Sequence, residues 1–263
     1  MKKLAFSIAK SRTKFLLLLL VIEMIILSCI SPYFFNMNNL LQVTQFGATL
    51  TLLSLGEALV MISGRDGIDI SIGSTMSLSG VIFGLAVMNG ANIPIAAFIT
   101  LLGGVVFGAV NGVLVAVAKV PALIATLGTQ YIYSSLALYL TGGIPISGFP
   151  DSFALLSLKS TFGIPNQILF VVIPVSVLIF ILVYKMKFGR RVYLMGTNPE
   201  AAKYAGIREM KVRAMVYVLA GVLASVSAII NNSWLMTARA DAGSGTEMQA
   251  ITVAVLGGIG VAG

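Results

Sequence analysis

The 263-residue sequence is 58% hydrophobic and only 10% charged, whereas a typical soluble domain is about 25% charged. Together with a mean hydropathy of +1.00, this composition excludes an ordinary water-soluble fold. The net charge of +8 at pH 7 would suit a nucleic-acid partner, but the basic residues are placed as in a membrane protein, so we expect no nucleic acid.

Eight long apolar runs, separated by short polar breaks, follow one another along the chain. About 20 apolar residues are needed to cross the hydrocarbon core, where a helix satisfies its own backbone groups. The runs predict an all-α, polytopic transmembrane helix bundle that forms one domain over residues 1–263. The expected spans, in chain order, are Phe15–Phe34, Thr44–Ser63, Ile70–Met88, Pro94–Ala118, Ala122–Leu140, Gln167–Tyr184, Val212–Asn232 and a last one from Met248. The last run is still apolar at Gly263, which predicts a truncated span and a C-terminally incomplete domain.

The 17 basic residues divide unevenly between the two sides of such a bundle. If the N-terminus is cytoplasmic and the chain crosses at every run, only Lys159 and Arg239 lie outside. The inside residues are Lys2, Lys3, Lys10, Arg12, Lys14, Arg65, Lys119, Lys185, Lys187, Arg190, Arg191, Lys203, Arg208, Lys211 and Arg213. This bias follows the positive-inside rule and predicts a multi-pass protein with a cytoplasmic N-terminus.

The segment between the second and third runs, residues 63–74, interrupts the apolar pattern with glycines and charges. Asp69 or Ser71 can cap the helix that follows. An unpaired charge deep in a membrane costs about 2.5–3.5 kcal/mol, so these groups, and Glu57 within the second run, must be satisfied or near water. A capped cytoplasmic turn is one interpretation. The other assigns Asp69, Ser71, Glu57 and Asn111 to the pathway or its gate.

The fourth run carries glycines at every fourth position, Gly104, Gly108 and Gly112. Small residues at this spacing let two membrane helices approach closely. The pattern indicates helix packing, either within the bundle or at a subunit interface or narrow pathway. The seventh run repeats the spacing with Ala220, Ala224 and Ala228.

A polar, basic loop over residues 186–211 separates the sixth and seventh runs. Asn198 is a good N-cap, Pro199 suits the first helical position, and Gly206 suits a left-handed C-cap. The pattern predicts a two-turn helix, about 10 Å long, which is too short to be stable alone. We therefore expect it to dock on a partner protein. A basic loop lying on anionic lipid is the alternative.

Several chemistries are excluded by what the sequence lacks. It has no histidine and no G-x-x-x-x-G-K-[ST] loop, so neither histidine-based catalysis nor P-loop ATP hydrolysis is expected. The acidic residues are scattered, without the paired spacing of a metal site in a bundle. We expect no catalytic residue, metal or cofactor, and a protein that is not an enzyme. A transporter driven by an ion gradient and a pure membrane scaffold remain as alternatives.

Three stretches resemble the permeases of ribose-, xylose- and galactoside-type ABC importers, a family that includes the autoinducer-2 importers. They are Gly67–Ser74, then Gly189–Arg190 through Asn198–Ala202 to Ala205–Ile207, and Gly243–Met248 with Ala250–Ile251 and Val255–Gly258. The spacing between them also fits, so the resemblance covers essentially the whole chain. The chain departs from the family pattern at Arg65 and Asp66, which stand between Gly64 and Gly67 where the family usually has Gly-Gly.

The resemblance implies a transport subunit of a bacterial plasma membrane importer for a sugar or sugar-like solute. Two permease subunits, identical or different, form a pore within the lipid, each with about ten helices in the type II arrangement. A cytoplasmic ATP-binding subunit docks on Pro199–Ala205, and an extracellular binding protein delivers the solute. The residues expected to couple to the ATPase are Gly189, Arg190, Asn198, Pro199, Glu200, Ala201, Ala202 and Gly206. Related permeases carry nucleosides or branched-chain amino acids, and these solutes remain open.

Overall fold

The computed structural model describes residues 12–64 and 67–260 and divides into two compact units, residues 1–44 and 45–263. The described chain is mostly helical, which confirms the all-α class. The helices are α2 (Arg12–Ile30), α3 (Met37–Ile62), α4 (Ile72–Met88), α5 (Ile93–Gly112), α6 (Ala122–Thr141), α7 (Asp151–Ala154), α8 (Ile173–Tyr184), α9 (Lys187–Thr197), α10 (Pro199–Tyr204), α11 (Glu209–Leu235) and α12 (Thr246–Leu256). Two π-helical turns, η1 (Val113–Val117) and η2 (Ile168–Val172), and four two-residue strands, β1 (Ile146–Ser147), β2 (Ser160–Thr161), β3 (Ile164–Pro165) and β4 (Thr237–Ala238), complete it.

The first unit consists of α2, a short turn and the beginning of α3. The turn is closed by the Asn39 side chain, whose Nδ2 donates to the carbonyl of Phe34 at 2.9 Å. Most side chains of α2 are exposed and apolar, as expected of a helix surrounded by lipid.

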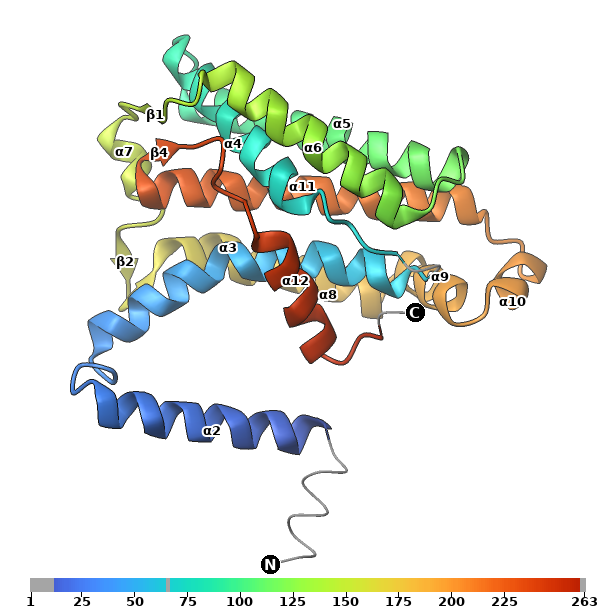
Figure 1. The fold of residues 1–263 in the computed structure, drawn as a ribbon, viewed down its shortest axis with the longest axis horizontal. Helices are drawn as coiled ribbons and strands as arrows, with labels where there is room; N and C mark the ends of the chain where they lie inside the picture. The colour runs from blue at the N-terminus through green and yellow to red at the C-terminus, as the bar shows by residue number, and fades with distance from the viewer. Residues whose placement is uncertain (1–11, 65–66, 261–263) are drawn as a thin grey trace, which may run out of the picture. The chain divides into compact units, whose positions relative to one another are not determined.

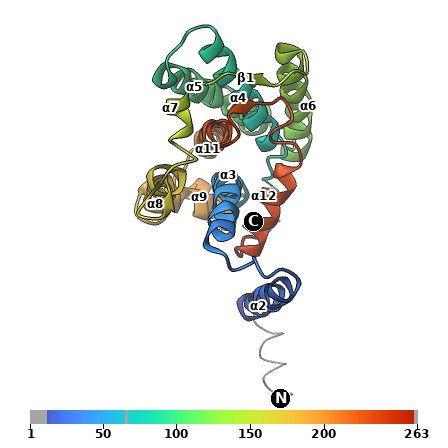
Figure 2. The same ribbon diagram turned by 90° about the vertical axis from the view of Figure 1, so that its left-hand side faces the viewer.

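In the second unit α11 is the central helix (Figures 1 and 2). Its 27 residues are about 40 Å long at 1.5 Å per residue, more than enough to cross a bilayer. Helices α4 and α5 pack along it, and α3 meets it on another face, where Gly56 lies against Ala220.

Glycines bring α5 into backbone contact with α11. A Cβ added at Gly104 would overlap Ser225, one at Gly108 would overlap the carbonyl of Tyr217, and one at Gly112 would lie 2.9 Å from Ala214 Cα. Gly104, Gly108 and Gly112 therefore face α11 within this chain, as helix packing through small residues requires.

The π-helical turn η2 stands directly before Pro174 in α8. Proline has no N–H and its ring clashes with the preceding turn, so a regular α-helical hydrogen bond cannot form there. A wider π turn is one way for a helix to absorb that defect.

One end of the unit carries short strands and aromatic packing. Strand β1 pairs antiparallel with β4, so that Ile146 lies opposite Ala238, and β2 pairs with β3. Phe83 of α4 contacts the rings of Phe149 and Phe153 beside them. This cluster fixes the end of α11 and the start of the segment that leads to α12.

Each of the eight predicted apolar runs contains a helix. Within the described residues, Met37–Ile62, Ile93–Val117 and Glu209–Leu235 are long and apolar enough to cross a membrane. The pair α8 and α9, bent by 65°, gives up to four. Helices α4 and α12, with 17 and 11 residues, are shorter than a full crossing requires. Arg65 and Asp66, the basic residues before Arg12 and the end of the last run at 261–263 lie outside the described residues.

Candidate translocation and coupling sites

The break between α3 and α4 is organised around two buried carboxyl groups. Asp69 Oδ1 accepts hydrogen bonds from the Ser71 backbone N–H at 2.9 Å and from the Ser71 hydroxyl at 2.6 Å. Glu57, from within α3, accepts from the Asp69 N–H at 3.1 Å through Oε1. The predicted N-cap of α4 is therefore indirect. Asp69 fixes Ser71 at the start of α4 by hydrogen bonds, and the Ser71 side chain itself makes no capping hydrogen bond to the helix.

Helices α5 and α6 extend the same set of hydrogen bonds. Asn111 Nδ2 donates to the Ser71 hydroxyl oxygen at 2.7 Å, and Asn111 Oδ1 accepts from the Thr129 hydroxyl at 2.7 Å. Asn111 therefore joins α5 to both α4 and α6. The four residues selected from the sequence as pathway or gate candidates all lie in one cluster.

Thr126 supports the non-helical backbone of the break. Its hydroxyl oxygen accepts from the Ile70 N–H at 3.2 Å, and the hydroxyl lies 3.3 Å from the Ile68 carbonyl oxygen and 2.8 Å from that of Ala122. Irregular backbone at membrane depth needs such partners, since lipid offers none. Sequence reasoning missed Thr126 and Thr129. Their three-residue spacing on one face of α6 was the available signal.

We call these six residues the break network; they are Glu57, Asp69, Ser71, Asn111, Thr126 and Thr129. None is more than 3% exposed. Among the described residues, Glu57 Oε2 and the nearby Tyr217 hydroxyl are buried without a hydrogen-bond partner. The cluster is sealed from solvent, and its bonds hold four helices and a broken backbone in one arrangement.

The loop predicted at 186–211 contains two helices rather than one. Helix α9 leaves α8 at a 65° bend, and a Cβ added at Gly189 would overlap the Val183 carbonyl at the end of α8. Gly189 therefore permits this bend. Val192 and Met195 of α9 are buried in the core of the unit. The sequence pattern did not predict α9.

The far end of α9 meets the end of α3 backbone to backbone. A Cβ at Gly196 would overlap the Ile62 carbonyl oxygen, and one at Gly64 would lie 2.7 Å from Gly196 Cα. Gly64 has a positive φ of 75°, which glycine adopts without strain. Arg213, at the start of α11, donates through Nη1 to the Gly64 carbonyl at 2.7 Å. The chain that leads into the break network is thus held by α9 and α11.

Helix α10 has the predicted caps. Asn198 Oδ1 accepts from the Ala201 N–H at 2.9 Å, and Gly206 has a φ of 71°. Ala202 is fully buried, whereas Glu200 and Tyr204 are exposed, Tyr204 at 91%. Arg190, Asn198 and Pro199 are also exposed, and Ala201 is half-buried. Among the described residues no hydrogen bond joins α10 to the break network, whereas Gly196 of α9 contacts Gly64, five residues before Asp69.

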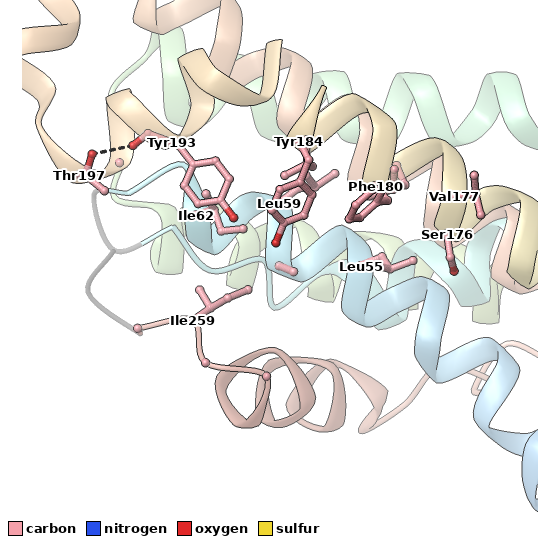
Figure 3. A pocket seen from close by; sticks show the side chains of 17 residues that line it. Leu55, Leu59, Ile62, Ser176, Val177, Phe180, Tyr184, Tyr193, Thr197 and Ile259 are labelled. Atoms are coloured by element: carbon pink, nitrogen blue, oxygen red, sulfur yellow. Dashed lines mark hydrogen bonds between the residues drawn. The ribbon is translucent and has the colours of Figure 1, made fainter. Parts of the chain in front are cut away.

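An apolar cavity of about 760 Å³ lies beside α9, bounded by α3, α8 and residues 257–260. Figure 3 shows Leu55, Leu59, Phe180 and Tyr184 along it, with Tyr193 at the Thr197 end and Ser176 at the other. Most of its lining side chains are apolar, so most of its surface cannot hydrogen-bond a polar solute. Among the described residues no group of three or more His, Cys, Asp or Glu side chains could hold a metal ion.

Comparison with known proteins identifies the family of the chain. The family described as "branched-chain amino acid transport system / permease component" matches residues 39–263. The chain belongs to this permease family. No solved structure matches it.

Curated relatives of the permease extend the match over nearly its whole length. It is 36% identical to the autoinducer 2 import system permease protein LsrD of Enterobacter sp. over 255 residues, which cover 94% of this chain and 77% of the relative. It is 39% identical over 234 residues to a probable ABC transporter permease protein of Sinorhizobium fredii, covering 88% and 69%. The autoinducer 2 import system permease protein LsrC of Salmonella typhi is 35% identical over 256 residues, covering 97% and 73%.

These matches establish an integral membrane protein that is a permease of the ABC type. It is a transport subunit rather than an enzyme. Membership in an ABC importer family implies two partners, an ATP-binding subunit and a solute-binding protein.

Proposed function

We propose that this permease imports a sugar or sugar-like solute across the bacterial plasma membrane by alternating access. ATP hydrolysis in the separate ATP-binding subunit drives the cycle, and the permease performs no chemistry on the solute. The resemblance to sugar-type importers supports the solute class, as do relatives whose names state import of autoinducer 2. Nucleosides and branched-chain amino acids, the latter named in the family description, are the alternative solutes.

The proposed topology places the N-terminus in the cytoplasm. The chain forms a single permease domain of the type II arrangement, and the eight predicted spans are among about ten of that arrangement. The excess of basic residues on the inside supports it. Residues 186–211, including α9 and α10, then lie on the cytoplasmic side and form the coupling loop. A second permease subunit, identical or different, completes the pore.

The observation that carries the proposal is the contact of α9 with the end of α3. Because Gly196 and Gly64 touch through backbone atoms, a displacement of the coupling loop reaches residue 64 without passing through flexible side chains. Five residues later the chain enters the break network at Asp69. In this proposal Glu57, Asp69, Ser71 and Asn111 hold the gate together rather than line the path, since they are sealed from solvent.

The surface of α10 has the form of a docking site for the ATP-binding subunit. Glu200, Lys203 and Tyr204 are exposed, and a hollow of about 240 Å³ lies between Pro199, Glu200, Lys203, Ile207 and Glu209. An exposed aromatic side chain beside a hollow is typical of an interface anchor. Ala202 attaches the other side of α10 to the permease core.

The coupling role is tested in vesicles that contain the full-length permease, its ATPase and the binding protein. Replacing Glu200 and Ala201 together by tryptophan blocks the docking surface, and we expect ATP-driven uptake to fall by about tenfold or more, equivalent to at least 1.4 kcal/mol. Lys159→Trp, in the exposed loop between β2 and α7, is the matched control and should transport normally. Full uptake by the double variant would refute the coupling role.

The same vesicles separate the alternative mechanisms. Uptake that survives ATP depletion but stops when the ion gradient is dissipated would identify a secondary transporter. Absence of any solute flux, with correctly assembled protein, would indicate a scaffold. Our proposal requires uptake that depends on ATP and on the binding protein together.

A further inference from the structure

A second cavity, of about 220 Å³, lies between α4, α6 and the segment that joins β4 to α12. Unlike the cavity beside α9, it is surrounded by polar side chains. Its polar lining includes Ser74 and Ser77 of α4, Gln130 and Ser134 of α6, Asp241 and Glu247. None of these six residues was selected from the sequence as a site.

The cavity lies about halfway along α11. Ser79 of α4 is hydrogen-bonded to Ser225, near the middle of α11, at 2.9 Å. Two residues before Ser79 on α4, the Ser77 hydroxyl oxygen accepts from the Gly243 N–H at 2.8 Å. The segment after β4 has therefore turned back from the end of α11 toward its middle, as Figure 1 shows. Helix α12 begins at this depth.

The return segment is held against α4 by a contact that only glycines allow. A Cβ at Gly73 would overlap the Gly243 carbonyl, and a Cβ at Gly243 would overlap the Gly73 carbonyl. The cavity wall is consequently fixed backbone to backbone, as a preformed binding site requires. Its position does not depend on flexible side chains.

Glu247, in the first turn of α12, is the buried carboxyl group of this cavity. The residue is only 8% exposed, and among the described side chains Gln130 Nε2 reaches its carboxyl group, at 3.3 Å. A carboxylate can accept about four hydrogen bonds. An acidic residue at mid-membrane depth is costly and marks a functional site by default. Glu247 lines the cavity, so the acceptor capacity that Gln130 leaves unused is within reach of a solute bound there.

We propose that this cavity is a solute subsite of the translocation pathway and that it binds an uncharged, polyhydroxylated molecule about the size of a monosaccharide. The inference rests on the proposed transport function and makes its substrate class specific. Glu247 accepts hydrogen bonds from solute hydroxyls. Gln130 and the serine hydroxyls of the lining both donate and accept.

The lining discriminates between the solute classes left open by the sequence. Leu138 is the one large apolar side chain among the lining residues, and none of them is aromatic. A branched-chain amino acid needs an apolar pocket for its side chain, and a nucleoside base usually stacks on an aromatic ring. Neither is present in the lining. A volume below the roughly 300–1,000 Å³ of drug-sized sites also favours a small solute.

The charge of the cavity argues against anionic solutes. Arg239 donates to both carboxylate oxygens of Asp241, at 2.9 and 2.8 Å, and lowers the pKa of that carboxyl group. Asp241 is thereby charged but paired, while Glu247 adds a second acceptor. A phosphorylated or carboxylated solute would meet two carboxyl groups and no unpaired cation among the lining residues.

The test uses the full-length permease with its ATPase and binding protein in vesicles. Uptake of labelled D-ribose, D-xylose and D-galactose is measured first, and the sugar carried fastest becomes the probe. Ser134→Phe fills the cavity and Glu247→Ala removes its main acceptor. For both we expect the amount of sugar imported per ATP hydrolysed to fall by about fivefold or more. Glu247→Gln, which keeps one acceptor oxygen, should retain at least half of the ratio.

Two neighbours provide matched controls, because both are exposed and neither lines the cavity. They are Ser135→Phe on α6 and Gln249→Ala on α12. Both should import sugar per ATP as the unmodified permease does. A purely structural effect would lower ATP hydrolysis and transport together and leave their ratio unchanged, so an unchanged ratio in Ser134→Phe and Glu247→Ala overturns the proposal.

The failure of this inference is distinguishable from the failure of the transport function. If the unmodified vesicles show no ATP-dependent uptake, the proposed function itself is wrong. If they import labelled leucine or uridine faster than every sugar, the permease is an importer but the polyol subsite is refuted. Sugar import that falls selectively in the cavity variants supports both.

Discussion

The break network and the cavity at Glu247 use the same kinds of residue, carboxyl, amide and hydroxyl groups inside a helical bundle. In the break network Asp69 bonds two groups of Ser71, and Asn111 is bonded through both ends of its amide. In the cavity the described residues give Glu247 one long side-chain bond, from Gln130, and Glu247 adjoins open space.

This difference teaches that intramembrane polarity alone does not locate a transport path. A polar group whose partners are all protein groups stabilises one conformation. A polar group with spare acceptors beside a cavity can exchange its partner for a solute. By this criterion the break network is a conformational support and the Glu247 cavity is a receiving site. Variants of residues in the two regions test this distinction.

The largest effect is expected at the contact that connects the coupling loop to the break network. Gly196→Ala forces a methyl group against the Ile62 carbonyl, and we expect a loss of about 3 kcal/mol in the free energy of unfolding. Gly128→Ala, in open space on α6, should instead stabilise its helix by about 0.5–1 kcal/mol. Unfolding in mixed detergent micelles measures both. Equal stability of the two variants would remove the proposed link.

The next effect is expected from the carboxyl group at the centre of the break network. Asp69→Ala leaves the Ser71 N–H and hydroxyl without their acceptor, at a cost of about 2 kcal/mol. Asp69→Asn keeps one acceptor and should lose about half as much. Thermal unfolding of the detergent-solubilised permease reports the difference. If Asp69→Ala were as stable as the unmodified chain, the network would not hold the break.

The smallest effects compare one hydroxyl from each region on the same helix. Thr129→Val removes the donor to Asn111 and should cost about 1 kcal/mol. Ser134→Ala removes a cavity hydroxyl and should change stability by less than about 0.5 kcal/mol. The same unfolding measurement applies. A larger loss for Ser134→Ala would show that the cavity hydroxyl is structural, against our distinction.

Much of the fold could be predicted from the sequence, because apolar runs and caps are local signals. The helix positions follow the runs, and Asn198 and Gly206 cap α10 as their residue types indicate. The small-residue faces were recognisable, but their pairing was not. Gly104 packs on Ser225 and Gly221, whereas Ala220 packs on Gly56 of α3. Which face meets which depends on the three-dimensional packing of several helices.

The candidate sites were predictable to different extents, because local patterns reveal single residues but not how distant segments pack together. Charges such as Asp69 and Glu57 stand out in an apolar sequence, and the fold brings them together. Glu247 lies in the Gly243–Met248 stretch but was not selected as a site residue, because it opens a helix, where an acidic residue has an ordinary explanation in the helix dipole. Only the return of residues 239–245 to the depth of Gly73 shows its unusual position. That return involves residues 170 apart in the chain, beyond the reach of any local pattern.

The glycines at the two ends of α9 have a mechanical consequence. The helix is about 16 Å long at 1.5 Å per residue, and it is seated against Val183 at one end and against Ile62 and Gly64 at the other. A stiff rod with both ends in backbone contact cannot absorb a displacement by side-chain rearrangement. In the proposed coupling, a tilt of α9 therefore moves α3 and α8 as a pair, and the length of α9 sets how far these membrane helices are displaced.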